Sequence, residues 1–225
     1  MTKPIDSKMI TAEFHCHSAY SSDCQTDIAG LIEYARELGL DRLAITDHNT
    51  IAGALLAKEL APDLIIVGEE VQTARGELIG YFIKDEIPRG LSVRETLRRL
   101  KDQGAFISVP HPFDLMRHGW RQSELLELLP DVDALEVFNA RCLRESYNDQ
   151  ALAFARQNRT SMLAGSDAHA LGEIGLALTH LPEFRTADDL RIAVKDTVID
   201  GSILSKLDHL KTSLKTGWSK LAGRK

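Results

Sequence analysis

Short apolar runs rich in β-branched residues alternate along the chain with stretches in which apolar residues recur every three or four positions. This alternation predicts repeated βα units, with helices packed around a mainly parallel sheet that is either open or closed into a barrel. The expected strands are residues 10–14, 42–45, 64–67, 106–109, 134–138, 161–164 and a weaker one at 176–181.

Two of the expected helices carry clear boundary signals. In residues 27–38 the apolar side chains fall on one stripe, and Gly39 follows as a stop signal. Ser92 and Glu95 form a capping-box pattern that opens a second helix, which extends to about residue 102 and ends before Gly104. Both helices fall between expected strands, as the βα pattern requires.

One segment departs from this repeat after the third expected strand. Residues 70–73 and 77–83 have strand-like composition and flank a turn formed by Ala74, Arg75 and Gly76. The pattern predicts an inserted β-hairpin.

The end of the chain differs in charge from the rest. With no internal repeat or flexible linker, we expect one domain over residues 1–202, followed by a basic amphipathic helix over 203–225. Residues 206–225 carry a net charge of +5, against −11 for residues 1–205. Such a helix is able to contact RNA, an anionic membrane or a partner chain. We favour the simpler interpretation, in which its apolar stripe packs on the domain and its basic face remains in water.

Composition narrows the class of protein. The 225 residues carry a net charge of −6, which argues against a surface built mainly to bind nucleic acid. The chain has three cysteines, namely Cys16, Cys24 and Cys142. An odd and small number of cysteines in a chain of this length indicates reduced thiols and not a disulfide framework. The first nine residues lack the apolar core of a secretory signal, and no apolar run approaches the length of a membrane span. We therefore expect a cytoplasmic protein that does not associate with membranes.

Polar residues cluster where the expected strands end, which is where parallel α/β folds place their chemistry. Five of the eight histidines stand at these ends, namely His15, His17, His48, His111 and His169. Because the carboxyl ends of parallel strands meet at one rim, we expect these imidazoles to lie together.

The spacing of these residues suits metal binding. His15 and His17 are two residues apart, which directs both side chains to the same side of an extended segment. Asp167 and His169 repeat this spacing after the sixth expected strand. Imidazole nitrogens combined with carboxylate oxygens favour Mn, Zn or Fe. By the same alternation, Cys16 is expected to face the barrel wall.

The acidic residues of the rim strengthen this interpretation. Asp23, Glu70, Glu77 and Asp167 would each cost several kcal/mol if they were buried without a cation. Two or three divalent ions would remove that cost.

Six segments together resemble the PHP (polymerase and histidinol phosphatase) family of metal-dependent phosphoesterases. They are HCHSAYSSD (15–23), ITDHNT (45–50), GEEV (68–71), VPHPFD (109–114), EVFNAR (136–141) and AGSDAH (164–169). The resemblance covers about residues 10–180. It implies an α/β fold, a distorted (β/α)7 TIM-like barrel with a trinuclear metal centre at the C-terminal rim of its strands.

The resemblance also implies which residues hold the ions. The first ion would be held by His15, His17, Glu70 and Asp167. The second would share Glu70 and add His111 and Glu77. The third would be held by Asp23, His48 and His169.

The assignment also depends on the acidic residues Glu69 and Glu70, Glu77 and Asp47. Glu70 fits the family's glutamate better than Glu69, because it directly precedes the apolar residue of the next strand. Glu77 stands where many relatives have a histidine, so the second ion would be held by a carboxylate instead of an imidazole. Asp47 is expected to orient an imidazole through its other ring nitrogen.

The implied reaction is hydrolysis of a phosphate ester by a metal-activated water. Three residues are expected to take part in catalysis, namely His48, His169 and Asp167, with one of the two histidines assisting the leaving group. Three others are expected to bind substrate, namely Arg117, Asn139 and Arg141. The guanidinium groups suit this role because they match the geometry of phosphate oxygens.

The resemblance leaves the substrate and two alternative functions open. The substrate would be a small phosphomonoester, a nucleotide bisphosphate or the end of a short nucleic acid, with no obligate protein partner. A metal-dependent amidohydrolase also begins with an H-x-H pair, but it usually adds a lysine that the strand-end motifs here lack. A non-catalytic PHP module that binds a polymerase-type partner would often lack ligands, whereas eight of the nine positions here match outright.

Overall fold

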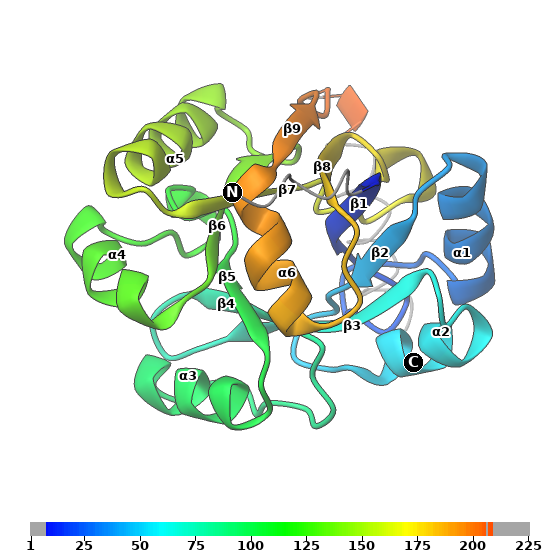
Figure 1. The fold of residues 1–225 in the computed structure, drawn as a ribbon, viewed down its shortest axis with the longest axis horizontal. Helices are drawn as coiled ribbons and strands as arrows, with labels where there is room; N and C mark the ends of the chain where they lie inside the picture. The colour runs from blue at the N-terminus through cyan, green and yellow to red at the C-terminus, as the bar shows by residue number, and fades with distance from the viewer. Residues whose placement is uncertain (1–7, 206, 209–225) are drawn as a thin grey trace, which may run out of the picture.

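The computed structural model describes residues 8–205, 207 and 208, and these form one mixed sheet that is almost closed into a barrel (Figure 1). The strands are β1 (Met9–Cys16), β2 (Arg42–Ile45), β3 (Ile65–Gln72), β4 (Glu77–Tyr81), β5 (Phe106–Val109), β6 (Ala134–Asn139), β7 (Ser161–Gly165), β8 (Ala177–Pro182) and β9 (Val198–Gly201). Their order in the sheet is β7-β6-β5-β4-β3-β2-β1-β8-β9. The predicted α/β barrel is confirmed.

Backbone hydrogen bonds close the barrel where β1 and β7 end. The amide of Asp167 donates to the carbonyl of His15 at 2.7 Å, and the amide of His17 donates to the carbonyl of Ala168 at 2.9 Å. The two H/D-x-H segments are therefore joined to each other directly.

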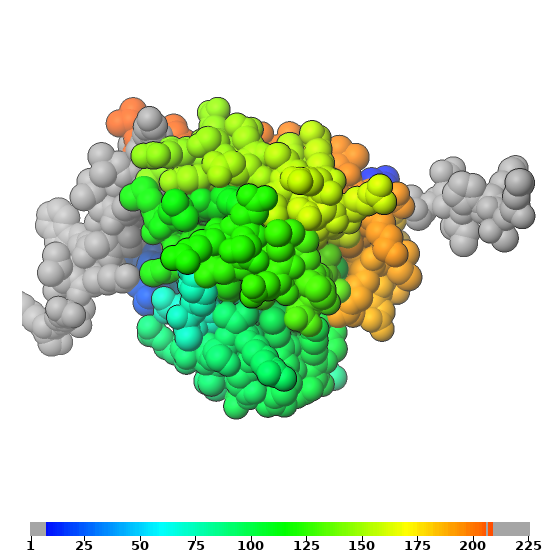
Figure 2. Space-filling view, turned by 90° about the vertical axis from the view of Figure 1, so that its left-hand side faces the viewer, coloured from blue at the N-terminus to red at the C-terminus, as the bar shows by residue number. Residues whose placement is uncertain are grey.

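Helices surround the sheet and cover one of its ends. They are α1 (Ile28–Glu37), α2 (Ala52–Leu60), α3 (Val93–Asp102), α4 (Gln122–Leu128), α5 (Glu145–Asn158) and α6 (Ala187–Ala193). Figure 1 shows α1 to α5 around the outside, and Figure 2 shows the flank formed by α5, α4 and α3, with α6 at its right-hand edge. Because α6 closes one end of the barrel, the opposite rim is the place for a site.

Two apolar clusters account for this arrangement. The larger one lies between the sheet and the outer helices and includes Leu31, Leu43 and Leu97. The second fills the barrel interior, where Phe14 and Tyr81 pack with Leu190 of α6. Cys16 belongs to the larger cluster and donates to the carbonyl of Ala44 at 3.3 Å, as its alternation predicts.

The expected hairpin is part of the barrel wall. Residues 64–67 and 70–73, predicted as two separate strands, belong mostly to the continuous strand β3. β4 pairs antiparallel with both β3 and β5. The expected strand at 176–181 is β8, which runs antiparallel to β1 and pairs with β9. The predicted hairpin is confirmed, whereas the pairing of β4 with β5 and the direction of β8 were not predicted, because apolar periodicity does not report strand direction.

The helix boundary signals are largely confirmed. Asp27 accepts a hydrogen bond from the amide of Gly30, and Ser92 accepts one from the amide of Glu95. A capping box also requires the amide of Ser92 to donate to the Glu95 carboxylate. This part of the prediction is wrong, because that carboxylate binds Arg98 and Arg99 instead. The carboxylate thus pairs with arginine side chains of its own helix and not with the backbone amide at the helix start.

The expected C-terminal helix falls mostly outside the described residues. Residues 203–205 have no helical backbone, so the predicted start at 203 is wrong, and residues 206 and 209–225 are not described. Within the part of the chain that is described, no helix combines the length and apolar character needed to cross a bilayer.

Candidate metal centre

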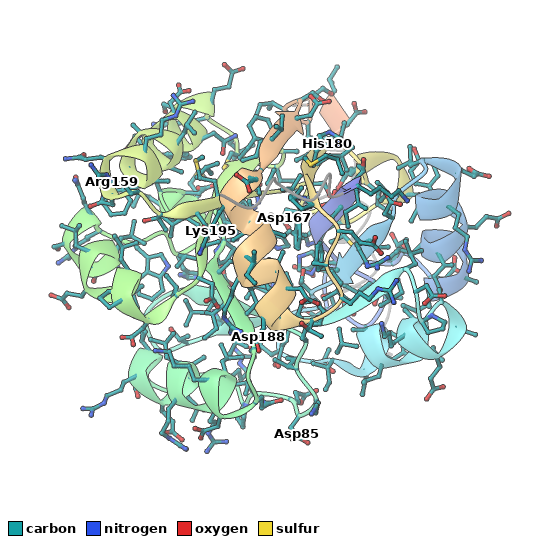
Figure 3. All side chains as sticks on the ribbon, in the orientation of Figure 1. Asp85, Arg159, Asp167, His180, Asp188 and Lys195 are labelled. Atoms are coloured by element: carbon teal, nitrogen blue, oxygen red, sulfur yellow. The ribbon has the colours of Figure 1, made fainter. Side chains whose placement is uncertain are left out.

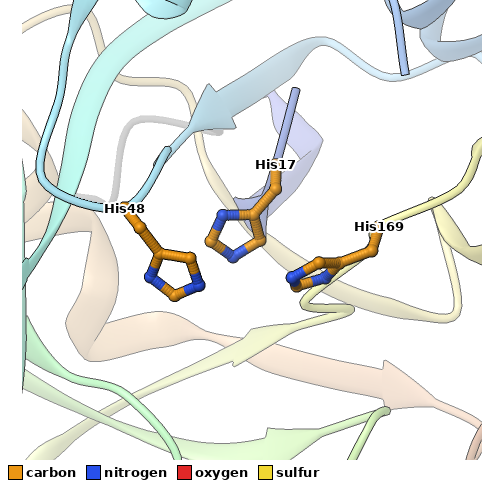
Figure 4. Close-up of side chains that lie close together, drawn as sticks. All are labelled: His17, His48 and His169. Atoms are coloured by element: carbon orange, nitrogen blue, oxygen red, sulfur yellow. The ribbon is translucent and has the colours of Figure 1, made fainter. Parts of the chain in front are cut away.

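The predicted ligands meet at the rim opposite α6. His15 and His17 are at the end of β1, Glu70 is within β3, and the other histidines follow β2, β5 and β7. Figure 4 shows the imidazoles of His17, His48 and His169 converging, with centroids 4.5 Å apart for His17–His48 and 4.3 Å for His17–His169. In Figure 3, Asp167 projects inside the ring of strands.

Glu70 lies at the centre of the cluster and is almost fully buried. Its Oε2 atom is 3.3 Å from His15 Nε2, 3.4 Å from His17 Nε2 and 3.1 Å from His48 Nδ1. Its Oε1 atom is 3.0 Å from His111 Nε2. One carboxylate therefore faces four imidazoles, as expected of a ligand shared between ions.

Asp167 forms a second acidic contact for the imidazoles. Its Oδ1 atom is 3.2 Å from His17 Nε2, 3.6 Å from His15 Nε2 and 3.6 Å from His169 Nδ1. The φ angle of Asp167 is 54°, an uncommon backbone conformation for a residue other than glycine. This turn is what brings the carboxylate back over the end of β1.

The remaining two acidic residues lie at the edges of the cluster. Asp23 is 3.4 Å from His48 Nε2 and 3.6 Å from His169 Nε2. Glu77 is 3.8 Å from His111 Nε2. All nine predicted ligands are thus brought together, and sets of three donor atoms within 4.8 Å of one another recur among them. Their assignment to particular ions stays a prediction.

In three of the imidazoles, Nδ1 carries a hydrogen and donates it to an acceptor within the protein. Nδ1 of His15 contacts the Glu136 carboxylate at 2.9 Å, and Nδ1 of His169 contacts the carbonyl of Asp167 at 2.8 Å. Both partners only accept hydrogen bonds, so each Nδ1 carries a hydrogen. A neutral imidazole then has a lone pair on Nε2.

His17 has the same arrangement through a serine. Its Nδ1 is 3.1 Å from Ser21 Oγ, and that hydroxyl donates its single hydrogen to Asp47 at 3.0 Å. Ser21 must therefore accept from Nδ1, which leaves the lone pair of His17 on Nε2.

The Nε2 lone pair of His17 faces Glu70 Oε2 at 3.4 Å and Asp167 Oδ1 at 3.2 Å, which is repulsive unless a cation lies between them. Among the residues that the structure describes, His17 Nε2 and Asp23 Oδ1 are buried and have no hydrogen-bond partner. Buried polar atoms are nearly always satisfied, so two unpartnered atoms in one cluster fit a site that binds a cation. The donor set therefore fits divalent metal ions.

The pKa shifts of His15 and His17 also agree with a site that binds cations. Burial alone would lower the pKa of His15, but the carboxylates of Glu70 and Asp167 raise it well above its ordinary value. Burial and the neighbouring His169 and His48 lower the pKa of His17 to about 3, so its imidazole is neutral. The cluster thus attracts positive charge while keeping His17 Nε2 free as a ligand.

Glu69 and Asp47 are acidic residues that stand next to predicted ligands in the sequence. Glu69 does not contact the cluster, because its Oε2 accepts a hydrogen bond from the amide of Ile87 at 2.9 Å. Glu70 and not Glu69 is therefore the glutamate at the site. Asp47 accepts from the amide and hydroxyl of Ser18, both at 2.6 Å, and from Ser21. Asp47 is therefore linked through Ser21 to Nδ1 of His17, in line with the prediction that it orients an imidazole through its other ring nitrogen.

The three predicted substrate-binding residues already have partners within the protein. Arg117 is ion-paired with Asp167, and its Nη2 donates to Asn139 Oδ1 at 3.0 Å. Asn139 Nδ2 contacts Asp167 Oδ2 at 3.4 Å. Arg141 Nη1 is 2.9 Å from Glu173, whose Oε2 also accepts from the amide of His169 at 2.8 Å. These contacts support the ligand loops, and a role in binding substrate stays a prediction.

Sequence reasoning missed the supporting residues. Glu136 binds His15 Nδ1 and also accepts from the amide of His111 at 2.6 Å. Glu13 accepts from the amides of His15 and Ser166, and its burial raises its pKa to about 7. Both glutamates interrupt strands that otherwise read as apolar, which is the signal that could have identified them.

The sequence is similar to that of several other proteins. The family model described as PHP-associated matches residues 145–198. An uncharacterised protein of Methanocaldococcus jannaschii is 34% identical over 216 residues, which cover 92% of this chain and 87% of that protein. The error-prone DNA polymerase of Mycobacterium tuberculosis is 40% identical over 80 residues, which cover 32% of this chain and 7% of the polymerase.

Solved structures share the fold. A two-domain protein from Bacteroides vulgatus that contains a predicted PHP-like metal-dependent phosphoesterase superposes with a TM-score of 0.75 at 20% identity, over 96% of this chain and 72% of that one. The lesion-specific endonuclease EndoQ of Pyrococcus furiosus gives 0.61 at 16% identity, over 85% and 58%. An amidohydrolase from Chromobacterium violaceum also gives 0.61, at 15% identity over 72% and 88%. At these identities the likeness concerns the fold alone.

Proposed function

Because the chain belongs to the PHP (polymerase and histidinol phosphatase) family, we propose that it is a hydrolase of phosphate ester bonds that uses two or three divalent ions of Mn, Zn or Fe. The observation that carries this proposal is the Nε2 lone pair of the buried, neutral His17, which faces Glu70 Oε2 at 3.4 Å and Asp167 Oδ1 at 3.2 Å. When bound, divalent ions neutralise the charge of a phosphate ester, activate water at neutral pH and stabilise the leaving oxygen.

The protein's own groups would hold these ions in three sets. The first set is His15, His17, Glu70 and Asp167, the second is Glu70, His111 and Glu77, and the third is Asp23, His48 and His169. Glu70 is common to the first two sets, which suits a carboxylate with two oxygens that face different imidazoles.

Access to the cluster is from one side. His15 and Glu70 are fully or almost fully buried, whereas the side chains of His48 and Asp23 are 24% and 32% exposed. The substrate would therefore approach over His48 and Asp23. His48 or His169 is then placed to assist the leaving oxygen, and Asp167 to orient the reacting groups.

The substrate would be a small phosphomonoester, a nucleotide or the end of a short nucleic acid. The likeness to a polymerase segment and to an endonuclease supports phosphate ester chemistry in general without choosing among these.

The two rival functions receive less support. Within the described part of the chain, no lysine forms an ion pair with a carboxylate of the cluster, unlike an amidohydrolase with a bridging lysine. A non-catalytic module has no need for a complete set of ligands, whereas all nine converge here.

The test is an assay of the protein loaded separately with Mn, Zn and Fe. The panel would contain p-nitrophenyl phosphate, its bis ester, histidinol phosphate, 3'-phosphoadenosine 5'-phosphate and a 5'-phosphorylated oligoribonucleotide. We expect ion-dependent turnover of at least one ester. Turnover should be lost in His17→Ala and kept in His180→Ala, an imidazole on β8 that binds Thr11. Bound ions with no ester hydrolysed would overturn the proposal.

A further inference from the structure

The loop between β5 and α4 exposes two large apolar side chains beside the cluster of ligands. Leu115 is 71% exposed and Met116 is 67% exposed. The loop begins at His111, one of the predicted ligands, and the residue after the exposed pair is Arg117, which is ion-paired with Asp167. The exposed pair is therefore attached to the cluster on both sides.

Asp114 holds this loop in one conformation. Its amide donates to the carbonyl of His111 at 3.0 Å, and its Oδ1 accepts from the amide of Met116 at 3.0 Å. Its Oδ2 accepts from Arg117 Nε at 3.0 Å, and its carbonyl accepts from the amide of Gly119 at 2.9 Å. A Cβ atom at Gly119 would stand 2.7 Å from that carbonyl, so the turn requires glycine. The apolar side chains are thus presented by an ordered loop.

A third exposed apolar residue lies in the neighbouring loop. Arg117 Nη2 donates to Cys142 Sγ at 3.4 Å, and Leu143, which follows directly, is 41% exposed. Leu115, Met116 and Leu143 are here called the apolar rim. Single exposed apolar residues are ordinary, whereas exposed apolar residues on two loops that Arg117 joins to each other and to Asp167 are placed to form a contact surface.

We infer that the apolar rim binds the organic group that is esterified to the phosphate, and that this group is apolar or aromatic. The inference rests on the proposed function, because a phosphate held at the cluster is what would place the esterified group beside the rim. Arg117 joins the two parts, since it pairs with Asp167 and directly follows Met116. A small polar ester group would gain nothing from such a surface, whereas an apolar one would be removed from water there.

The test compares two dianions that the protein cannot hydrolyse. Binding of phenylphosphonate and of methylphosphonate to the manganese-loaded protein would be measured by titration calorimetry. We expect phenylphosphonate to bind about tenfold more tightly. This preference should nearly vanish in a Leu115→Ser, Met116→Ser double variant. It should persist in Ile192→Ser, because Ile192 is 69% exposed on α6 at the opposite end of the barrel.

The outcomes separate this inference from the proposed function. Equal binding of both phosphonates would overturn the inference alone, and so would a phenyl preference that survives in the double variant. Failure of both phosphonates to bind, together with no ester hydrolysis, would overturn the proposed function as well.

Discussion

Glu136 accepts the Nδ1 hydrogen of His15 at 2.9 Å, and the two residues come from strands that are not neighbours in the sheet. The second oxygen of the same carboxylate accepts from the amide of His111 at 2.6 Å and from Asn139 Nδ2 at 2.9 Å. One buried acidic side chain therefore fixes the orientation of one predicted ligand and the backbone of another.

Replacing Glu136 by glutamine should weaken metal binding while the barrel still folds. The amide has one acceptor oxygen where the carboxylate has two, so either His15 or His111 loses its partner. Changes of this kind beside a metal site typically cost about 10- to 100-fold in affinity. Metal content after dialysis against graded free zinc would measure the effect, with circular dichroism to confirm the fold. Unchanged zinc affinity would show that Glu136 does not orient His15.

Removal of divalent ions should lower the Tm of the protein. A ligand that binds only the folded state stabilises it by about 2.7 kcal/mol at a free concentration 100 times its Kd. Calorimetry before and after chelation would show the change. His17→Ala or Asp167→Ala should bind fewer ions per chain, lose turnover and show a smaller response to chelation. A full chelation response and full turnover in both variants would contradict the ligand assignment.

The stability of the protein should fall as the pH rises because of Glu69. Burial raises the pKa of this carboxyl from 4.5 to about 8. Between these values the folded state binds more protons than the unfolded state, so rising pH favours unfolding, by at most about 1.4 kcal/mol per pH unit.

The matched variant for this effect is Glu69→Gln, which cannot ionise. Denaturant titrations of both proteins at pH 5.5 and pH 8.5 should show that the variant gains stability relative to the wild type at the higher pH. Glu86→Gln is the control, since Glu86 is only a minor cause of the shift. An unchanged difference between wild type and Glu69→Gln across this range would refute the prediction.

A methyl group at Gly165 should destabilise the protein and disturb the site. A Cβ atom there would collide with the Glu136 carboxylate and with the Cβ of His15, both fixed by the hydrogen bond between them. Overpacking of this kind typically costs about 1–3 kcal/mol. Gly172→Ala is the control, because a Cβ there meets no atom of the described residues within 4 Å. Equal free energies of unfolding for the two variants would contradict the crowding seen at Gly165.

The sequence was most informative where one residue's position along a strand decides its role. Alternation placed His15 and His17 on one side of β1 and Cys16 on the other, as the structure has them. Strand ends located the ligands because parallel α/β units share one rim.

The errors concern relationships that a linear pattern does not contain. β8 has the apolar content of any buried strand, so its antiparallel direction was not visible, whereas the predicted hairpin already implied the antiparallel direction of β4. Asp47 reaches the ring of His17 through Ser21, and the sequence pattern did not show which imidazole it would orient or that a serine would lie between them. The pairing of Glu136 with His15 required two distant strands to be placed in space.

The hydrogen bonds between His15, His17 and the 167–168 segment join the first and the last parts of the candidate centre along the chain. The first H-x-H pair is synthesised well before Asp167, and it meets that carboxylate only when the segment after β7 lies against the end of β1. A fragment that ends before this segment would therefore keep His15 and His17 but lack two of the nine predicted ligands, Asp167 and His169.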